Sequence, residues 1–490
     1  MNRFDERYAS LIYFLFEKND WCSLADLSEK TGYSRSTIWR DITFLNVGLP
    51  EGWFIEKSES EGARLIKSPN GTLEGIWSYM KNENPYFQIL EYIILNNGVT
   101  INDIATAVHI SRSTVYRQLD QIKEVVEEAG ITLDTSPLRL NGDEKKVRRF
   151  MMQYLEYKGL DYLNDLKNID LQSFRDAIVN YTTELSITLH LGAVQRLSFI
   201  LEIINIRISM ECYVSFPKEI YNKYKNTVHF DIAKKMFPFM EKCPTREQQT
   251  QEILYFCLCL LSEDMPNNMT EELYKIRIKM KENKDDPSVL FLHELSDYLH
   301  FDLTQDDYFL YKYFSTIKRT KYDTQFYTDT RMNTALPFLP YVREHPLFIG
   351  IEKLVKNHLE NETMSYGKLE ILELFILVDA FLIRKKNSMK INTVLICRTY
   401  IELDYLYQLL DYHFGKHLDI KIYDLSDIDV IKRHNHIDLV ISTLKGQFLK
   451  EHLPVLKIST FPTEAELSGI RRFIDKYLIK RLHLNETLSD

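Results

Sequence analysis

The segment Ser34-Arg35-Ser36-Thr37-Ile38-Trp39-Arg40 occurs a second time, 77 residues later, as Ser111-Arg112-Ser113-Thr114-Val115-Tyr116-Arg117. Five of the seven positions are identical, and the flanking residues 23–27 align with residues 100–104 at the same offset. Each copy has the pattern of a short helix, a tight turn and a second helix that begins with small hydroxyl residues and an arginine. One such copy could be only a helix cap, but two copies in matched context favour a pair of DNA-binding helix-turn-helix motifs.

The composition is that of a globular protein with several domains. A chain of 490 residues is long enough for roughly three to five of them. Glycine (16) and proline (14) are scarce, which predicts a mostly helical chain. The six cysteines have no regular spacing, which predicts a reduced, intracellular protein. The N-terminus has no apolar stretch of a signal peptide, and the most apolar run (369–383) is interrupted by acidic residues. We therefore expect a cytoplasmic protein without a membrane span.

Each motif is followed by a segment with the alternation of a β-hairpin, at residues 54–66 and 131–140, which predicts a wing. In the second helix of the first motif, Ile38, Ile42 and Leu45 have the spacing of an inward face. The hydroxyl, aromatic and arginine residues between them are expected to face DNA. They are Ser34, Arg35, Ser36, Thr37, Trp39 and Arg40 in the first module, and Ser111, Arg112, Ser113, Thr114, Tyr116 and Arg117 in the second.

The charge of the N-terminal part limits its affinity for nucleic acid. Residues 1–150 hold 18 Lys and Arg against 22 Asp and Glu, a balance of −4, so the sequence has no broad basic field. Positive charge is local, in the arginines of the two motifs and in the basic segment 145–149 (Lys145, Lys146, Arg148 and Arg149). We expect modest, salt-dependent binding by both modules together. The alternative is an adaptor that uses its modules for protein contacts.

Residues 150–388 consist almost entirely of amphipathic helical pattern. They contain no glycine-rich phosphate loop, no paired-carboxylate motif and no metal-ligand array, so no enzymatic activity, cofactor or metal is expected. His413 and His417, four residues apart, lack the glutamate of a zinc hydrolase. A weak internal repeat relates residues 228–235 to 344–353, and each is followed by an apolar, acidic helix. This repeat predicts two copies of one helical bundle.

The pattern changes after residue 390. Four apolar segments read as strands, at 393–397, 420–423, 437–442 and 454–459, with helical stretches between the first two and after the last. They predict a small parallel α/β sheet.

Taken together, these parts resemble the Mga/AtxA family of virulence regulators over essentially the whole chain. The resemblance implies a mostly α, multidomain fold with two winged helix-turn-helix modules (1–68 and 69–155), two all-helical PRD-like bundles (156–282 and 283–388) and an EIIB-like α/β domain (389–490). It also implies a cytoplasmic DNA-binding transcriptional regulator of virulence or surface genes. Its activity or oligomerisation would be tuned by histidine phosphorylation from the sugar phosphotransferase system.

The same resemblance implies candidate phosphorylation sites and partners. The segment 189–196 resembles the first histidine segment of a PRD, so His190 is the leading candidate phosphoacceptor. His229 and His345 follow, and His358 is weaker. The second histidine of each PRD lies in a late apolar helix, which here contains none, so phosphorylation is not expected there. The implied partners are double-stranded DNA and the phosphocarrier HPr or another phosphotransferase-system component.

The tail resembles EIIB, in which the active cysteine ends the first strand, and Cys397 stands at that position. An EIIB cysteine needs a loop of glycines and hydroxyls that presents N–H groups to phosphate. The following residues, 398–401, contain no glycine. We therefore expect a catalytically inactive domain that forms a homodimer, and a phosphotransfer carrier is the alternative.

Overall fold

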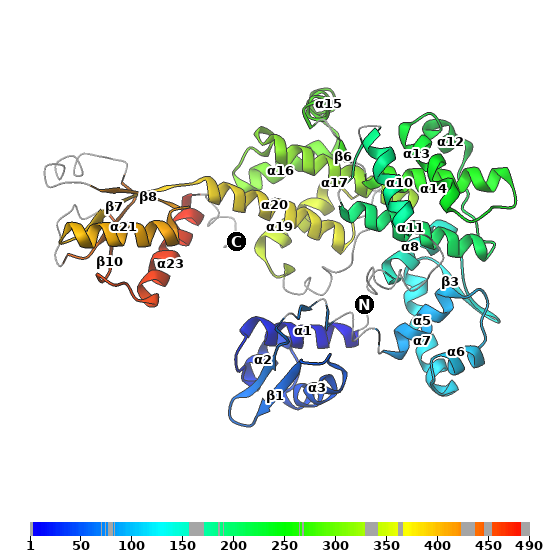
Figure 1. Ribbon diagram of the computed structural model, residues 1–490, viewed down its shortest axis with the longest axis horizontal. Helices are drawn as coiled ribbons and strands as arrows, with labels where there is room; N and C mark the ends of the chain where they lie inside the picture. Colours follow the sequence, from blue (N-terminus) through cyan, green and yellow to red (C-terminus); the bar gives the residue numbers. More distant parts are fainter. Residues whose placement is uncertain are drawn as a thin grey trace. The chain divides into compact units, whose positions relative to one another are not determined.

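The computed structural model has a mostly helical, multidomain fold with winged modules near the N-terminus and a parallel sheet near the C-terminus (Figure 1). It describes residues 3–69, 71–73, 75–76, 82, 84–155, 171–184, 187–189, 191–263, 265–266, 269–328, 342–360, 366–422, 437–444 and 453–481. The chain forms two compact units. They are Met1–Lys279 with Phe314–Glu344 and Leu359–Glu370, and Met280–Tyr313 with His345–His358 and Ile371–Asp490. The predicted fold class is confirmed.

The first winged module folds around its own core. Its elements are α1 (Arg3–Lys18), α2 (Leu24–Thr31), α3 (Arg35–Gly48), β1 (Phe54–Ser58) and β2 (Gly62–Ile66). Ser23 caps α2, and Gly32 ends it in the left-handed region at φ 74°. β1 and β2 pair antiparallel, and Cys22 forms an isolated β-bridge to Ala63 through two backbone hydrogen bonds (2.8 and 2.9 Å). Ile38, the inward residue of α3, is 1% exposed.

The second module repeats this plan at the same offset. Its elements are α5 (Pro85–Leu95), α6 (Ile101–Ala107), α7 (Arg112–Glu128), β3 (Thr132–Thr135), β4 (Leu138–Asn141) and the additional α8 (Glu144–Leu155). Thr100 caps α6 as Ser23 caps α2, and Val99 bridges Leu138 as Cys22 bridges Ala63. His109 stands where the first module has Gly32, and it too has a positive φ (56°). The sequence repeat is therefore a repeat of backbone geometry.

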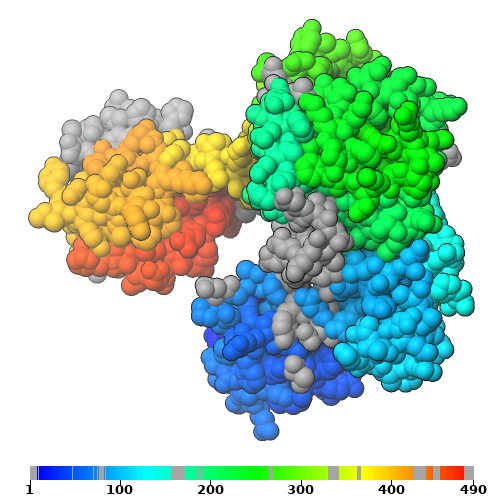
Figure 2. All heavy atoms as spheres, turned by 45° about the vertical axis from the view of Figure 1, so that its right-hand side comes forward, coloured from blue at the N-terminus to red at the C-terminus, as the bar shows by residue number. Residues whose placement is uncertain are grey.

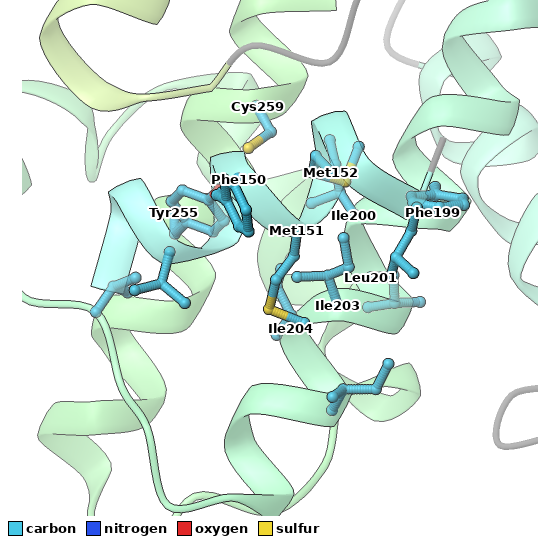
Figure 3. Packing of buried hydrophobic residues seen from close by; sticks show 14 of the residues in the cluster. Phe150, Met151, Met152, Phe199, Ile200, Leu201, Ile203, Ile204, Tyr255 and Cys259 are labelled. Carbon is cyan, nitrogen blue, oxygen red and sulfur yellow. The ribbon is translucent and has the colours of Figure 1, made fainter. Parts of the chain in front are cut away.

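The helices that follow the second module share its hydrophobic core. They are α10 (Leu171–Glu184), α11 (Leu191–Ser209), α12 (Lys218–Tyr224), α13 (Val228–Met236) and α14 (Arg246–Glu263). α15 (Met269–Glu282) follows them in the chain and is not part of this core. One cluster of buried residues extends from Tyr86 in α5 to Phe326. Phe150, Met151 and Met152 of α8 lie among side chains of α11 and α14 (Figure 3), and the surfaces of the two parts are continuous (Figure 2). α8 therefore joins the second module to the helical bundle without a break in packing.

A second helical group contains α16 (Pro287–Leu299), α17 (Asp307–Phe326), α19 (Pro346–His358) and α20 (Lys368–Ser388). α13 precedes α14 in the first group as α19 precedes α20 in the second, which is the order of the internal repeat seen in the sequence. Within the second unit, Phe309 stacks on Tyr313 and contacts Phe381 edge to face. No helix in the described part of the chain has the length and apolar composition needed to cross a membrane.

The C-terminal part is a parallel sheet with strand order β10-β9-β7-β8. Its elements are β7 (Ile391–Ile396), α21 (Tyr400–Phe414), β8 (Leu418–Ile422), β9 (Leu439–Ser442), β10 (Val455–Lys457) and α23 (Glu464–Arg481). α21 and α23 pack on the sheet through residues such as Leu406 and Ile470, which share a core with Ile391 and Leu395. Parallel strands bring their carboxyl ends to one edge, where ligands bind in open α/β sheets.

Candidate nucleic-acid interface

Both reading helices begin with the same hydrogen-bonded cap. The Ser34 hydroxyl accepts from the backbone N–H of Thr37 (3.2 Å), and Ser111 accepts from Thr114 at the same distance. Ser34 also lies 2.8 Å from the Thr37 hydroxyl, and Ser111 lies 2.9 Å from that of Thr114. The hydroxyls therefore cap the start of each helix. The interpretation of the repeat as a helix cap is thus compatible with its interpretation as a DNA-contacting segment.

The arginines of the repeat lie on the exposed face of each reading helix. Arg35 and Arg40 are exposed on α3, and Arg112 and Arg117 are exposed on α7. Within the described parts of the chain, no ion pair involves any of these four side chains. Exposed guanidinium groups without internal partners are suited to contact base edges or phosphates.

The aromatic residue of the repeat differs between the modules. In the first, Trp39 is half-buried, because the Lys57 ammonium from the wing lies 4.9 Å from its ring and donates to Thr43 (2.9 Å). In the second, Tyr116 is 58% exposed. The second module thus has an exposed aromatic ring on its reading helix, whereas in the first module a lysine ammonium lies against the aromatic ring.

Asn46 fixes the wing of the first module against its reading helix. Its side-chain amide donates to the carbonyl of Ile55 (2.8 Å), and its carbonyl accepts from the N–H of the same residue (2.7 Å). This double contact sets the angle between α3 and β1. Sequence reasoning missed Asn46, because a single polar residue near the end of a helix has no periodic signal.

The prediction that the basic segment 145–149 adds positive surface is wrong for Arg148. Arg148 is completely buried, where it forms two hydrogen bonds to Glu252 (2.6 and 3.0 Å). Arg149 pairs with Asp323 (3.0 Å), and Lys145 lies over the ring of Phe216. These side chains face the helical bundle because α8 is packed into the shared core. The charge of Arg148 is therefore not available to DNA.

Two sequence models of one family match these modules. Residues 5–61 match the M protein trans-acting positive regulator (MGA) HTH domain, and residues 69–155 match the Mga helix-turn-helix domain. In both winged modules the chain is similar to the Mga/AtxA family of regulators. The resemblance inferred from the sequence is thus confirmed.

Several regulators are similar to this chain along most of their length. The capsule synthesis positive regulator AcpB of Bacillus anthracis is 23% identical over 96% of this chain and 98% of its own. The anthrax toxin expression trans-acting positive regulator of the same organism is 21% identical, with the same coverage. The probable licABCH operon regulator of Bacillus subtilis is 23% identical over 82% of this chain and 65% of its own.

Two of the histidines to which the Mga/AtxA resemblance points, His229 and His345, lie at the beginnings of helices. His190 itself lies outside the described residues, but α11 begins at the next residue, Leu191. His229 is the second residue of α13 and is half-buried. His345 is exposed and directly precedes α19, where its Nδ1 accepts from the N–H of Leu347 (3.2 Å). The weaker candidate, His358, is instead the last residue of α19.

Arg196, in the same segment as His190, has an internal partner. It forms two hydrogen bonds to Glu263 of α14 (2.9 and 2.5 Å), a carboxylate that is almost completely buried. The guanidinium therefore ties α11 to the end of α14.

Cys397 follows β7 at the carboxyl edge of the sheet and is half-buried. Burial, together with the negative charge of Glu402, raises the pKa of its thiol to about 11. A thiol with so high a pKa is a poor nucleophile near neutral pH. Elsewhere, the described residues contain no group of three or more His, Cys, Asp or Glu side chains placed to bind a metal ion.

Proposed function

We propose that this chain is a cytoplasmic DNA-binding transcriptional regulator of virulence or surface genes that contacts double-stranded DNA with both reading helices. The observation that carries the proposal is the duplicated helix start, with two exposed arginines in each copy. The similarity to Mga/AtxA regulators supports it, because the similar proteins AcpB and the anthrax toxin regulator are named as positive regulators. The remaining parts of the chain then serve regulation.

Replacing Arg112 or Arg117 by alanine is expected to weaken binding to a target promoter by about 5–150-fold, the effect typical of one base or phosphate contact. A gel shift with purified protein measures the change. Lys275→Ala is the control, because Lys275 is exposed on α15 and pairs with Glu271 (2.9 Å) outside the winged modules. Wild-type affinity in both arginine variants would reject α7 as a reading helix.

The same assay separates the regulator from an adaptor that uses its winged modules for protein contacts. Binding through arginine–phosphate contacts must fall steeply as salt increases, because bound counterions are released. An adaptor would show no such fall with a duplex, because it would not bind it.

We further propose that activity or oligomerisation is tuned by phosphorylation of His190, His229 and His345 by HPr or another component of the sugar phosphotransferase system. His229 is the second residue of α13, and His345 directly precedes α19. A phosphoryl group adds about 1.5–2 negative charges, which a helix N-terminus stabilises. The added charge can then shift contacts between helices.

Incubation with labelled phospho-HPr is expected to place phosphate on at least one of these histidines, as mapped by mass spectrometry. Each histidine replaced by alanine should lose the corresponding label, whereas His413→Ala, on the exposed surface of α21, should not. Label absent from all three sites would contradict the proposal. Onward transfer to a downstream acceptor would favour a phosphotransfer carrier instead.

The EIIB-like domain is proposed to form a homodimer through α21. Large apolar side chains are exposed there: Ile401 and Tyr412 are each 85% exposed, and Phe461 beside α21 is 75% exposed. A cluster of this kind marks an interaction surface. Ile401→Asp with Tyr412→Asp is expected to convert dimer to monomer in analytical ultracentrifugation. Tyr274→Asp on α15, at 68% exposure, is the matched control, and an unchanged dimer in the double variant would exclude this surface.

A further inference from the structure

The second reading helix, α7, ends with charges of the wrong sign. Its last two residues are Glu127 and Glu128, and its last turn contains no basic residue. The C-terminal end of a helix carries partial negative charge, so cations stabilise it and carboxylates do not. A cation from another helix lies there instead, because a Cβ added at Gly130 would meet the Lys146 ammonium of α8 at 3.1 Å. Lys146 therefore supplies the positive charge that α7 lacks.

The same ammonium lies against the end of α17. The Lys146 nitrogen is 5.5 Å from the centre of the Tyr327 ring, and the Arg149 guanidinium is 6.0 Å from it. Cations over an aromatic face are attracted to it. Arg149 also pairs with Asp323 (3.0 Å), whose side chain is 4% exposed. One ring and one carboxylate at the end of α17 thus hold two neighbouring cations of α8.

The end of α17 is itself fixed in the shared core. Phe326 is 3% exposed and meets Phe216 and Tyr224 edge to face, with ring centres 6.3 and 6.2 Å apart. Tyr327 has a positive φ (57°), and its N–H donates to the carbonyl of Asp323 (2.7 Å). A bulky residue rarely adopts this conformation and keeps it only where its surroundings hold it. The contacts of the Tyr327 ring with α8 are of that kind.

The start of α17 is packed in the second helical group. Residues up to Tyr313 belong to the second compact unit, and those from Phe314 to Glu344 belong to the first. In the second unit, the Tyr313 hydroxyl donates to the carbonyl of Ser288 (2.8 Å), and its ring stacks on Phe291 (5.8 Å). One uninterrupted helix therefore has its start in one unit and its end in the other. Rigid elements of this kind can couple distant sites.

We propose that the end of α17 is a latch on the second reading helix. Tyr327 and Asp323 position the cations of α8, and one of these cations, Lys146, stabilises the C-terminal end of α7. Because α17 begins in the second helical group, a change in that group alters the reading helix through the latch. This regulation rests on the proposed function, the reading of DNA by α7, whereas the latch itself does not.

The first experiment measures amide hydrogen exchange in the full chain at residues 129–131, whose N–H groups donate to carbonyls in the last turns of α7. Tyr327→Ala is expected to raise the exchange rate there by about 2–30-fold, the factor for a charge at a helix C-terminus. Lys146→Met should raise it by a similar factor, and it covers the case in which Tyr327→Ala does not fold. Tyr181→Ala is the matched control, because it removes a ring of α10 that lies 4.6 Å from the ammonium of Lys235. It should leave residues 129–131 unchanged.

The double variant shows whether the two residues act in sequence. If Tyr327 acts through Lys146, then Tyr327→Ala combined with Lys146→Met raises exchange no further than the larger single effect. Effects that multiply in the double variant would overturn the proposal. Wild-type exchange at residues 129–131 in both single variants would also overturn it.

The second experiment adds duplex DNA and follows exchange at the end of α17, residues 325–328. Coupling is reciprocal, so a duplex that orders α7 should slow exchange there in wild type and not in Lys146→Met. Equal slowing in both would overturn the coupling. If wild type binds no duplex, the proposed function fails and the first experiment alone decides the latch.

The salt dependence of binding separates the latch from direct DNA contact by the same lysine. If Lys146 contacted a phosphate, Lys146→Met would make the slope of log affinity against log salt shallower by about 0.9. That result, together with unchanged exchange at residues 129–131, would overturn the proposal. The latch predicts an unchanged slope.

Discussion

Arg148→Met is expected to lower the free energy of unfolding by about 3–5 kcal/mol, the cost of breaking a buried ion pair by removing one partner. Arg148 and Glu252 are both fully buried, and they lie 104 residues apart in the chain. Without the guanidinium, Glu252 would keep only the hydrogen bond from the N–H of Val214 (3.1 Å). Urea denaturation, followed by a probe in the second module, measures the decrease.

Arg148 also contacts a second buried charge pair, which Glu144 and Arg207 form. Glu144 of α8 accepts from Arg148 (2.8 Å) and from Arg207 of α11 (2.9 and 2.7 Å). Burial opposes its ionisation, but the hydrogen bond from Arg207 and the charges of both arginines lower the pKa of Glu144. Its contribution to stability is therefore complete above the ordinary carboxyl pKa and is lost as the pH falls through the lowered value.

Two variants separate a buried charge from a general loss of packing. Arg148→Met combined with Glu252→Gln should recover part of the stability, because no uncompensated charge then remains at that pair. Lys123→Met on α7 breaks an exposed pair with Glu127 (3.9 Å) and should change stability by less than about 0.5 kcal/mol. A double variant no more stable than Arg148→Met would show that the charge is not the cause.

Removing both arginines of one reading helix, in Arg112→Ala with Arg117→Ala, is expected to reduce promoter affinity by about 10²–10⁴-fold, which is the gain that linked binding modules provide. The first module retains its own arginines, but residues 1–150 carry a net charge of −4 and offer no broad basic field as a substitute. The slope of log affinity against log salt should become shallower by about 0.9 for each phosphate that the variant no longer neutralises.

The corresponding variant of the first module, Arg35→Ala with Arg40→Ala, is the matched comparison. If both modules bind together, each double variant should reduce the affinity by a similar factor. A reduction confined to one of them would assign DNA binding to that module alone and leave the other for a different partner.

The winged modules could be predicted from the sequence because their determinants are local. The capping positions Ser34 and Ser111 and the inward spacing of Ile38 and Ile42 are set within short windows of sequence. The strands of the C-terminal sheet were predictable for the same reason, as β7 and β9 are short and nearly continuous apolar runs.

The surroundings of Arg148 and Glu402 could not be predicted, since their partners are distant in sequence. A helix with four basic residues near its start has the pattern of a solvated face, and only the buried position of Glu252 on α14 reverses that interpretation. Glu402 reads as an ordinary residue of a helical first turn. Its contact with Thr460, which follows β10, depends on the sheet order that brings these segments to the same edge.

The continuous core that joins α8 to α11 and α14 also concerns how such chains evolve. The family model for the second module ends at residue 155, the last residue of α8. The sequence similarity to the family that this model detects therefore ends with a buried helix. If recombination exchanged only this segment, Met151 and Met152 would have to pack against helices that come from a different protein. The segment with recognisable sequence similarity is therefore smaller than the unit that folds. We expect substitutions in α8 to be correlated with substitutions in the helices α11 and α14 that it contacts.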